Sequence, residues 1–118
     1  MQKITVYEKP TCTTCRSVAK ILIENGVDFE KVNYYIEPFT KRQLKILLKK
    51  MNMKPEELLR KNEVAYKEFG MANKKYTEDE ILLLMVNNPD LVQRPIVEKG
   101  DKAILARPAE KIKELFKV

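Results

Sequence analysis

Residues 3–22 read KITVYEKPTCTTCRSVAKIL, and this stretch decides the fold. Residues 3–7 alternate between polar and apolar side chains, which is typical of a short strand. From Cys12 onward the apolar residues recur at helical spacing until Gly26, which suits the left-handed backbone at a helix end. A second alternating segment over 29–34 predicts another strand. The order strand, helix, strand predicts a βαβ unit with two parallel strands.

The rest of the chain predicts a helical block and then a return to strands. Residues 38–89 show helical periodicity, with capping boxes that begin helices at Thr40 and Thr77. Residues 95–105 read as a hairpin around a glycine-containing turn, and Pro108 opens a last helix. The inner face of that helix is expected to carry Ile112, Leu115 and Phe116.

The composition excludes several kinds of active site. A length of 118 residues with 44% hydrophobic residues indicates one domain with a modest core. The absence of histidine excludes Ser-His-Asp triads, Cys–His pairs and HExxH zinc sites. The three glycines lie too far apart for a dinucleotide-binding or phosphate-binding glycine loop. Two cysteines without histidine cannot complete a four-ligand zinc site, so we expect no metal.

The charge balance indicates a basic but unclustered surface. Lysine and arginine number 23 against 17 acidic residues, which gives a net charge of +6 spread along the chain. This pattern predicts mild attraction to anions and no direct binding of nucleic acid. No apolar stretch reaches the length of a membrane span, and the first residues lack a signal-peptide pattern. We therefore expect a cytoplasmic monomer without membrane association.

The motif Cys12-Thr13-Thr14-Cys15 carries the strongest chemical signal. It stands at the start of the first predicted helix, where free N–H groups and the helix dipole favour an anion such as a thiolate. A lowered pKa of Cys12 and a reactive thiol are therefore expected. Two alternatives remain, namely a pair of small buried residues and a metal site completed by a second chain. A CxxC motif that opens a βαβ unit favours the redox interpretation and a thioredoxin-like fold.

We therefore predict an α/β, thioredoxin-like fold with a four-stranded mixed sheet in the order 2-1-3-4. The prediction is one domain over 1–118, with a core of 1–37 and 90–118 and a helical insertion, 38–89, between strands 2 and 3. In thioredoxin-like folds a cis-proline precedes the third strand, and Pro95 stands at that position. The Arg94–Pro95 peptide bond is accordingly expected to be cis.

The sequence resembles arsenate reductases of the glutaredoxin-linked type and their relatives, the Spx-like regulators. The resemblance covers nearly the whole chain and rests on YEKPTC at 7–12, LLRKN at 58–62, Asn88-Pro89, RPIV at 94–97 and Arg107-Pro108. It implies that Cys12 is the nucleophile and that Arg60, Arg94 and Arg107 bind the arsenate oxyanion. Arginine suits that task because its planar, permanently charged group donates several hydrogen bonds to one anion.

Two positions depart from the pattern of many reductases in that family. Glu8 stands where they carry histidine, and Cys15 stands where they carry serine or a similar residue. The Glu8 carboxylate is expected to raise the pKa of Cys12, whereas Arg16 is expected to oppose that effect. Cys15 lies inside the first helical turn and is expected to be more covered and less ionised than Cys12. The CxxC motif itself is shared with Spx-like proteins.

The resemblance implies an enzyme, an arsenate reductase or a related thiol oxidoreductase with a redox-active centre. Cys12 would attack arsenate, and glutathione with glutaredoxin, or thioredoxin, would supply electrons without a bound cofactor. Cys15 is a candidate resolving thiol that would form a disulfide with Cys12. The alternative is an Spx-like redox-switch transcriptional regulator that binds the RNA polymerase alpha subunit.

Overall fold

The computed structural model describes residues 3–115, and the chain forms two units. The first, called the core unit, comprises Met1–Glu37 and Arg94–Val118, and the second, called the helical unit, comprises Pro38–Gln93. The helical unit thus contains the predicted insertion and a few residues more. That both units form a single domain stays a prediction.

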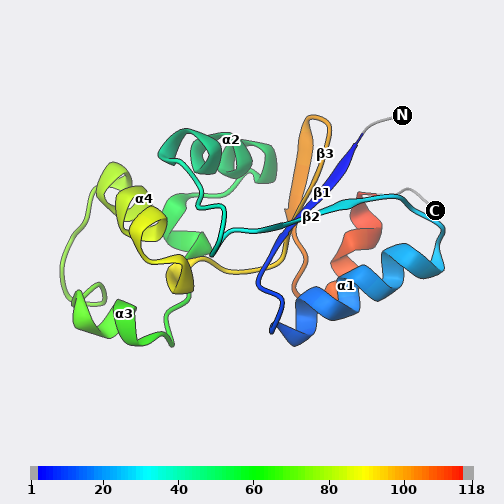
Figure 1. Cartoon of the computed structure of the whole chain (residues 1–118). Coiled ribbons are helices and arrows are strands. Elements are labelled where there is room, and N and C mark those ends of the chain that lie inside the picture. Colours follow the sequence, from blue (N-terminus) through cyan, green and yellow to red (C-terminus); the bar gives the residue numbers. More distant parts are fainter. Residues whose placement is uncertain (1–2, 116–118) are drawn as a thin grey trace. The chain divides into compact units, whose positions relative to one another are not determined.

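The core unit carries the sheet and two helices (Figure 1). Its elements are β1 (Ile4–Glu8), α1 (Thr13–Glu24), β2 (Glu30–Asn33), β3 (Ile96–Lys99), β4 (Lys102–Leu105) and the 3₁₀ helix η3 (Ala109–Glu114). The strand order is β2-β1-β3-β4, with β1 parallel to β2 and antiparallel to β3, and with β3 antiparallel to β4. This is the predicted thioredoxin-like sheet, and the βαβ unit at its start is confirmed.

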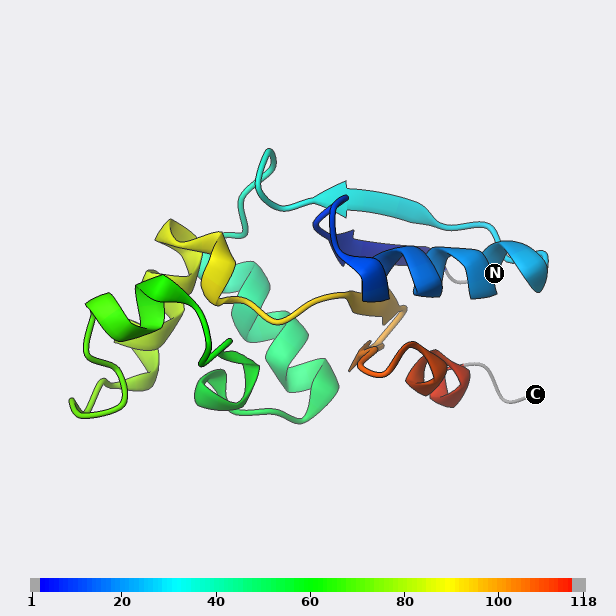
Figure 2. The ribbon, with the colours of Figure 1, turned by 90° about the horizontal axis from the view of Figure 1, so that it is seen from below.

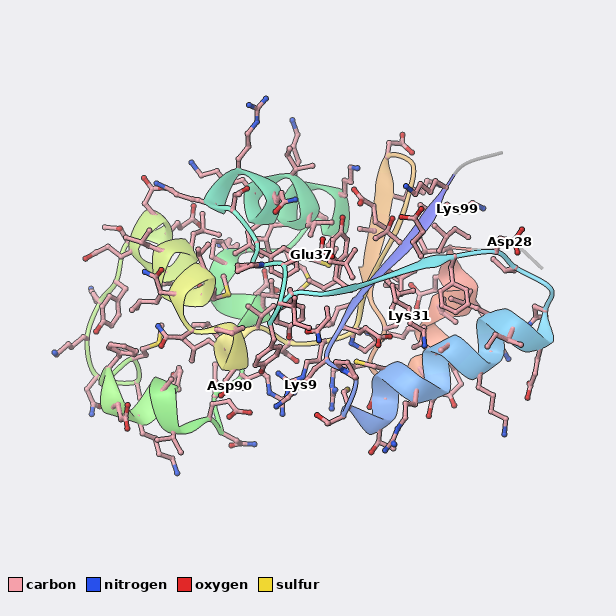
Figure 3. All side chains as sticks on the ribbon, in the orientation of Figure 1. Lys9, Asp28, Lys31, Glu37, Asp90 and Lys99 are labelled. Atoms are coloured by element: carbon pink, nitrogen blue, oxygen red, sulfur yellow. The ribbon has the colours of Figure 1, made fainter. Side chains whose placement is uncertain are left out.

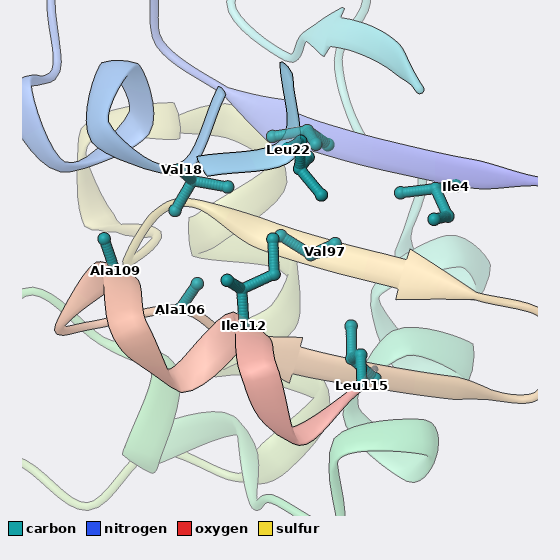
Figure 4. Packing of buried hydrophobic residues seen from close by; sticks show 9 residues of the cluster. Ile4, Val18, Leu22, Val97, Ala106, Ala109, Ile112 and Leu115 are labelled. Atoms are coloured by element: carbon teal, nitrogen blue, oxygen red, sulfur yellow. The ribbon is translucent and has the colours of Figure 1, made fainter. Parts of the chain in front are cut away.

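Both helices of the core unit pack on one face of the sheet (Figures 2 and 4). Val6 of β1 lies opposite Val97 of β3, so both side chains face the same side of the sheet. The cluster there comprises Ile4, Val6, Val18, Leu22, Val97, Ala106, Ala109, Ile112 and Leu115. The predicted inner residues Ile112 and Leu115 are therefore confirmed, while Phe116 lies outside the described residues.

Helix α1 begins and ends as its sequence predicts. Cys12 is the N-cap, with extended backbone, and its side chain accepts a hydrogen bond from the N–H of Cys15. At the other end Gly26 has a φ of 65°, a left-handed value that glycine adopts without steric cost. The N–H of Val27 then donates to the carbonyl of Leu22, which closes the helix end and directs the chain into β2.

The helical unit is built from short helices with well-defined starts (Figure 1). Its elements are α2 (Lys41–Met51), η1 (Pro55–Leu58), α3 (Val64–Glu68), α4 (Glu78–Asn87) and η2 (Pro89–Leu91). The predicted capping boxes at Thr40 and Thr77 are both present, with reciprocal hydrogen bonds to Gln43 and Glu80. Across residues 3–115, no helix is both long enough and apolar enough to cross a membrane.

Candidate active site

Cys12 sits where the chain passes from β1 into α1. Its backbone N–H donates to the carbonyl of Lys9 at 2.9 Å, which fixes the turn before the helix. Its Sγ accepts a hydrogen bond from the N–H of Cys15 at 3.3 Å, a backbone donor that no helical carbonyl satisfies. The Cys12 side chain is partly exposed, so a small reactant in solvent has access to the sulfur.

Cys15 occupies the inner face of the same helical turn. It is fully buried, as are Val18 and Leu22 further along that face. Both cysteines are free thiols in this structure, so it represents the reduced dithiol form. The predicted difference in burial between the two cysteines is therefore confirmed.

The surroundings of Cys12 favour its thiolate. Partial burial acts to raise the pKa of the Cys12 thiol, but hydrogen bonds from the thiol and the backbone N–H of Cys15 lower it. The positive charges of Arg94 and Arg107 lower it further, and the net pKa is below that of an ordinary cysteine. A thiolate beside two fixed cations is a nucleophile suited to an electrophile that itself carries negative charge.

Cys15 is held in the opposite protonation state. Burial raises the pKa of the Cys15 thiol to about 12, and the hydrogen bond to Cys12 contributes in the same direction. A backbone hydrogen bond from Lys9 opposes the rise, whereas the charges of Cys12 and Glu8 add to it. At neutral pH one sulfur is therefore poised to attack, while the other keeps its proton.

Arg94 and Arg107 flank the β3–β4 hairpin and are joined by a hydrogen bond. Arg94 lies two residues before β3 and is only 6% exposed, and an Nη of Arg107 donates to the backbone carbonyl of Arg94 at 2.8 Å. The Arg94–Pro95 bond is cis, as predicted, and the Arg107–Pro108 bond is cis as well. Pro95 itself is buried, and its carbonyl accepts a hydrogen bond from the N–H of Ala106.

Arg60, the third predicted oxyanion ligand, belongs to the helical unit. Its backbone N–H donates to the carbonyl of Leu91 at 2.8 Å, which ties the segment after η1 to η2. Its Nε donates to a carboxylate oxygen of Glu63 at 3.0 Å in a partly exposed ion pair. That Arg60 binds the same anion as Arg94 and Arg107 stays a prediction.

The two predicted pKa modulators have different surroundings. Glu8, the last residue of β1, is only 6% exposed, and its charge is among the causes that raise the pKa of Cys15. We expected that charge to act on Cys12, whose pKa is shifted instead by burial, Cys15, Arg94 and Arg107. Arg16 is exposed in the first turns of α1.

Tyr35 is a site residue that the sequence argument missed. Its hydroxyl accepts a hydrogen bond from an Nη of Arg94 at 3.4 Å, and the Arg94 guanidinium carbon lies 5.9 Å from the ring centroid. The ammonium of Lys9 lies 4.8 Å from the same centroid (Lys9 is labelled in Figure 3). Such cation–π contacts hold positive groups in place near the ring.

A positional signal for Tyr35 is present in the sequence. Strands β1 and β2 are parallel, so their carboxyl ends meet at the same edge of the sheet. Cys12 follows β1 and Tyr35 follows β2, which brings the two segments to that edge.

Among the described residues, no group of three or more His, Cys, Asp or Glu side chains is suited to hold a metal ion.

Limited alkylation of the reduced protein is expected to label Cys12 and spare Cys15. The pKa of Cys12 is lowered, so its labelling should persist at pH values below the ordinary thiol pKa of about 8.5. The pKa of Cys15 is raised to about 12 and its side chain is buried, so its labelling should require strongly alkaline pH or unfolding. Mass spectrometry of peptides after limiting iodoacetamide measures both reactions, and preferential labelling of Cys15 would contradict the assignment.

Comparison with known proteins places this site in a family. The sequence model of the ArsC family matches residues 7–115. An uncharacterized Escherichia coli protein, YfgD, is 36% identical over 115 residues, which cover 97% of each chain. The Escherichia coli arsenate reductase is 34% identical over 98% of this chain and 82% of its own length. The solved structure of an arsenate reductase from Vibrio cholerae shares the fold, with a TM-score of 0.93, 24% identity and 98% coverage of both chains. The chain therefore belongs to the ArsC family.

Proposed function

We propose that this protein reduces arsenate to arsenite with Cys12 as the nucleophile. The observation that carries the proposal is the partly exposed Cys12 sulfur, whose thiolate is favoured by the charges of Arg94 and Arg107. The family supports the same reaction, because relatives that match nearly the whole chain are arsenate reductases.

The first step uses the oxyanion-binding arginines. Arg94 and Arg107, with Arg60 as the third ligand, neutralise the arsenate charge and donate hydrogen bonds to its oxygens. The Cys12 sulfur then forms a bond to arsenic, and one arsenate oxygen leaves as water after it is protonated. Fixed cations accelerate this step because charge develops on oxygens that they already contact.

The second step reduces the arsenic and oxidises two thiols. A second sulfur attacks the Cys12 sulfur, an S–S bond forms, and the S–As bond breaks with its electron pair left on arsenic. Arsenic thereby passes from the pentavalent to the trivalent state and leaves as arsenite. We assign the second sulfur to Cys15, because it lies in hydrogen-bonding contact with Cys12 on the same helical turn. Glutathione is the external alternative, with glutaredoxin clearing the mixed disulfide.

Replacing Cys15 with serine separates the two routes. The wild-type protein is expected to form arsenite with thioredoxin as reductant and to accumulate a Cys12–Cys15 disulfide when no reductant is present. The Cys15→Ser protein should form arsenite only when glutathione and glutaredoxin are supplied, because Cys12 then depends on an external thiol. Arsenite production and intact protein mass are the measurements. Absence of arsenite from the wild-type protein with either reductant would contradict the proposed reaction.

A redox switch is the second candidate function. The reduced dithiol, with one buried high-pKa member and one partly exposed low-pKa member, is also suited to oxidation by cellular oxidants. In that case the protein would act as an Spx-like regulator and bind the RNA polymerase alpha subunit in one redox state. Copurification with that subunit, compared between reduced protein and oxidised protein, tests this candidate. Both functions suit a monomer in the cytoplasm, where thiols are kept reduced.

A further inference from the structure

Glu8 is a buried carboxyl group that neither step described above uses. Its side chain is only 6% exposed. Burial raises its pKa, and the nearby charge of Lys31 on β2 opposes the rise without cancelling it (Lys31 is labelled in Figure 3). Burial of an ionisable group is costly to a protein, so a role for Glu8 is expected.

The position of Glu8 places it beside Cys15. Residues Ile4, Val6 and Glu8 alternate with more exposed neighbours along β1, so their side chains share the face that α1 covers. Cys15 lies on the inner face of the first turn of α1, only a short loop after β1 ends. The charge of Glu8 also contributes to the raised pKa of the Cys15 thiol, which agrees with this placement.

We propose that Glu8 is the general base that accepts the proton of Cys15 when Cys15 attacks Cys12. The inference rests on the proposed function in taking Cys15 as the resolving thiol, but the chemistry of disulfide closure does not require arsenic. The Cys15 S–H bond breaks, its proton passes to a Glu8 oxygen, and the sulfur electron pair forms the S–S bond. The group previously attached to Cys12 leaves with the electron pair of its bond to sulfur. Glu8 later loses the proton to solvent.

A general base is needed because burial leaves the Cys15 thiol protonated and out of contact with water. Water does not reach the thiol, and with a pKa of about 12 only a very small fraction of it is ionised at neutral pH. A neighbouring carboxylate with a raised pKa is a better-matched proton acceptor than an ordinary, fully exposed glutamate. The same negative charge that disfavours a free Cys15 thiolate thus provides the base that removes its proton during attack.

Removing the Glu8 charge distinguishes this role from a purely electrostatic one. If Glu8 acted only through its charge, Glu8→Gln would lower the pKa of Cys15 and speed its attack on Cys12. If Glu8 is the proton acceptor, the same substitution slows that attack, by about tenfold or more. The two roles therefore predict opposite changes in the rate of one step.

The step can be isolated with the aromatic disulfide dithionitrobenzoate. Cys12 attacks the reagent first and releases one coloured thionitrobenzoate, and Cys15 then attacks the mixed disulfide and releases a second. Stopped-flow absorbance resolves the two phases. In Glu8→Gln the first phase should keep its wild-type rate and the second should be slower, while Glu8→Asp, which retains a carboxylate, should recover part of the rate. Glu24→Gln, an exposed acid at the end of α1, is the matched control and should leave both phases unchanged.

The pH profile supplies a second readout that loss of structure alone would not produce. The second-phase rate of the wild type should rise with pH through the ionisation of Glu8, above the ordinary glutamate pKa of about 4.3. Lys31 of β2 is the charged group that acts on Glu8, and Cys15 of the CxxC turn, on which the charges of Glu8 and Cys12 both act, is the titratable group on α1. Glu8→Gln should lack that inflection. A second phase that is unchanged or faster in Glu8→Gln, or an inflection that persists, would overturn the proposal, whatever the outcome with arsenate.

Discussion

Replacing Cys12 with serine is expected to reduce arsenite formation to the rate of buffer alone. Serine keeps the N-cap position filled, since its oxygen also accepts a hydrogen bond from the N–H of residue 15, so the helix should remain intact. The hydroxyl, however, is far less acidic and less nucleophilic than a thiol, and it cannot form the S–As or S–S bond. Arsenite release measured with each reductant system, together with the circular dichroism of the variant, checks this expectation.

The Cys15→Ser variant is the matched control for Cys12→Ser. Both substitutions remove one sulfur from the same helical turn, yet only Cys12 has a lowered pKa and a partly exposed side chain. With glutathione and glutaredoxin present, Cys15→Ser should still form arsenite, whereas Cys12→Ser should not. Residual reduction by Cys12→Ser above the buffer rate, or equal loss in both variants under these conditions, would remove Cys12 from the role of nucleophile.

Replacing either Arg94 or Arg107 with alanine is expected to weaken oxyanion binding roughly 10- to 150-fold. A hydrogen bond to a charged group contributes about 1.5–3 kcal/mol, and each factor of ten in affinity corresponds to about 1.4 kcal/mol. Both arginines also lower the pKa of Cys12, so each variant should shift the pH midpoint of Cys12 alkylation upward. Arsenate or sulfate titration and the alkylation profile measure the two effects independently.

Arg42→Ala is the control for these substitutions. Arg42 is an exposed residue of α2, and its loss should change neither affinity nor the pKa of Cys12. Arg60→Ala tests the third predicted ligand and should weaken binding within the same range without a shift in Cys12 alkylation. Wild-type affinity in both the Arg94 and Arg107 variants would show that the anion binds elsewhere.

Local sequence signals accounted for most of the fold. Alternating polarity predicted β1 and β2, the motifs at Thr40 and Thr77 predicted the starts of α2 and α4, and the glycine turn predicted the final hairpin. Each of these signals involves residues close together in the chain, where spacing alone determines which groups meet.

The arrangement of the site was harder to predict from the sequence, because it depends on residues that are distant in sequence. Sequence spacing could not place Tyr35 against Arg94, since the whole helical unit lies between these two residues in the chain. The target of the Glu8 charge was not predicted, because Glu8 was expected to act on Cys12, whereas this buried residue raises the pKa of Cys15 on the facing helix. The paired thiols themselves were predicted, because their spacing along one helical turn is a local feature.

The register of the β3–β4 hairpin determines how close Arg94 and Arg107 lie, although its turn is at the opposite end of the ladder. Ile96 pairs with Leu105, and continuing that ladder outward brings Arg94 opposite Arg107, which agrees with the hydrogen bond between them. The turn at Gly100 lies at the other end of the same ladder. A slip of one residue there would turn every following side chain to the opposite face and separate the two arginines. Relatives with a longer turn can therefore keep this anion site only if the added residues stay outside the ladder, which makes the turn length a simple criterion for recognising chains that retain it.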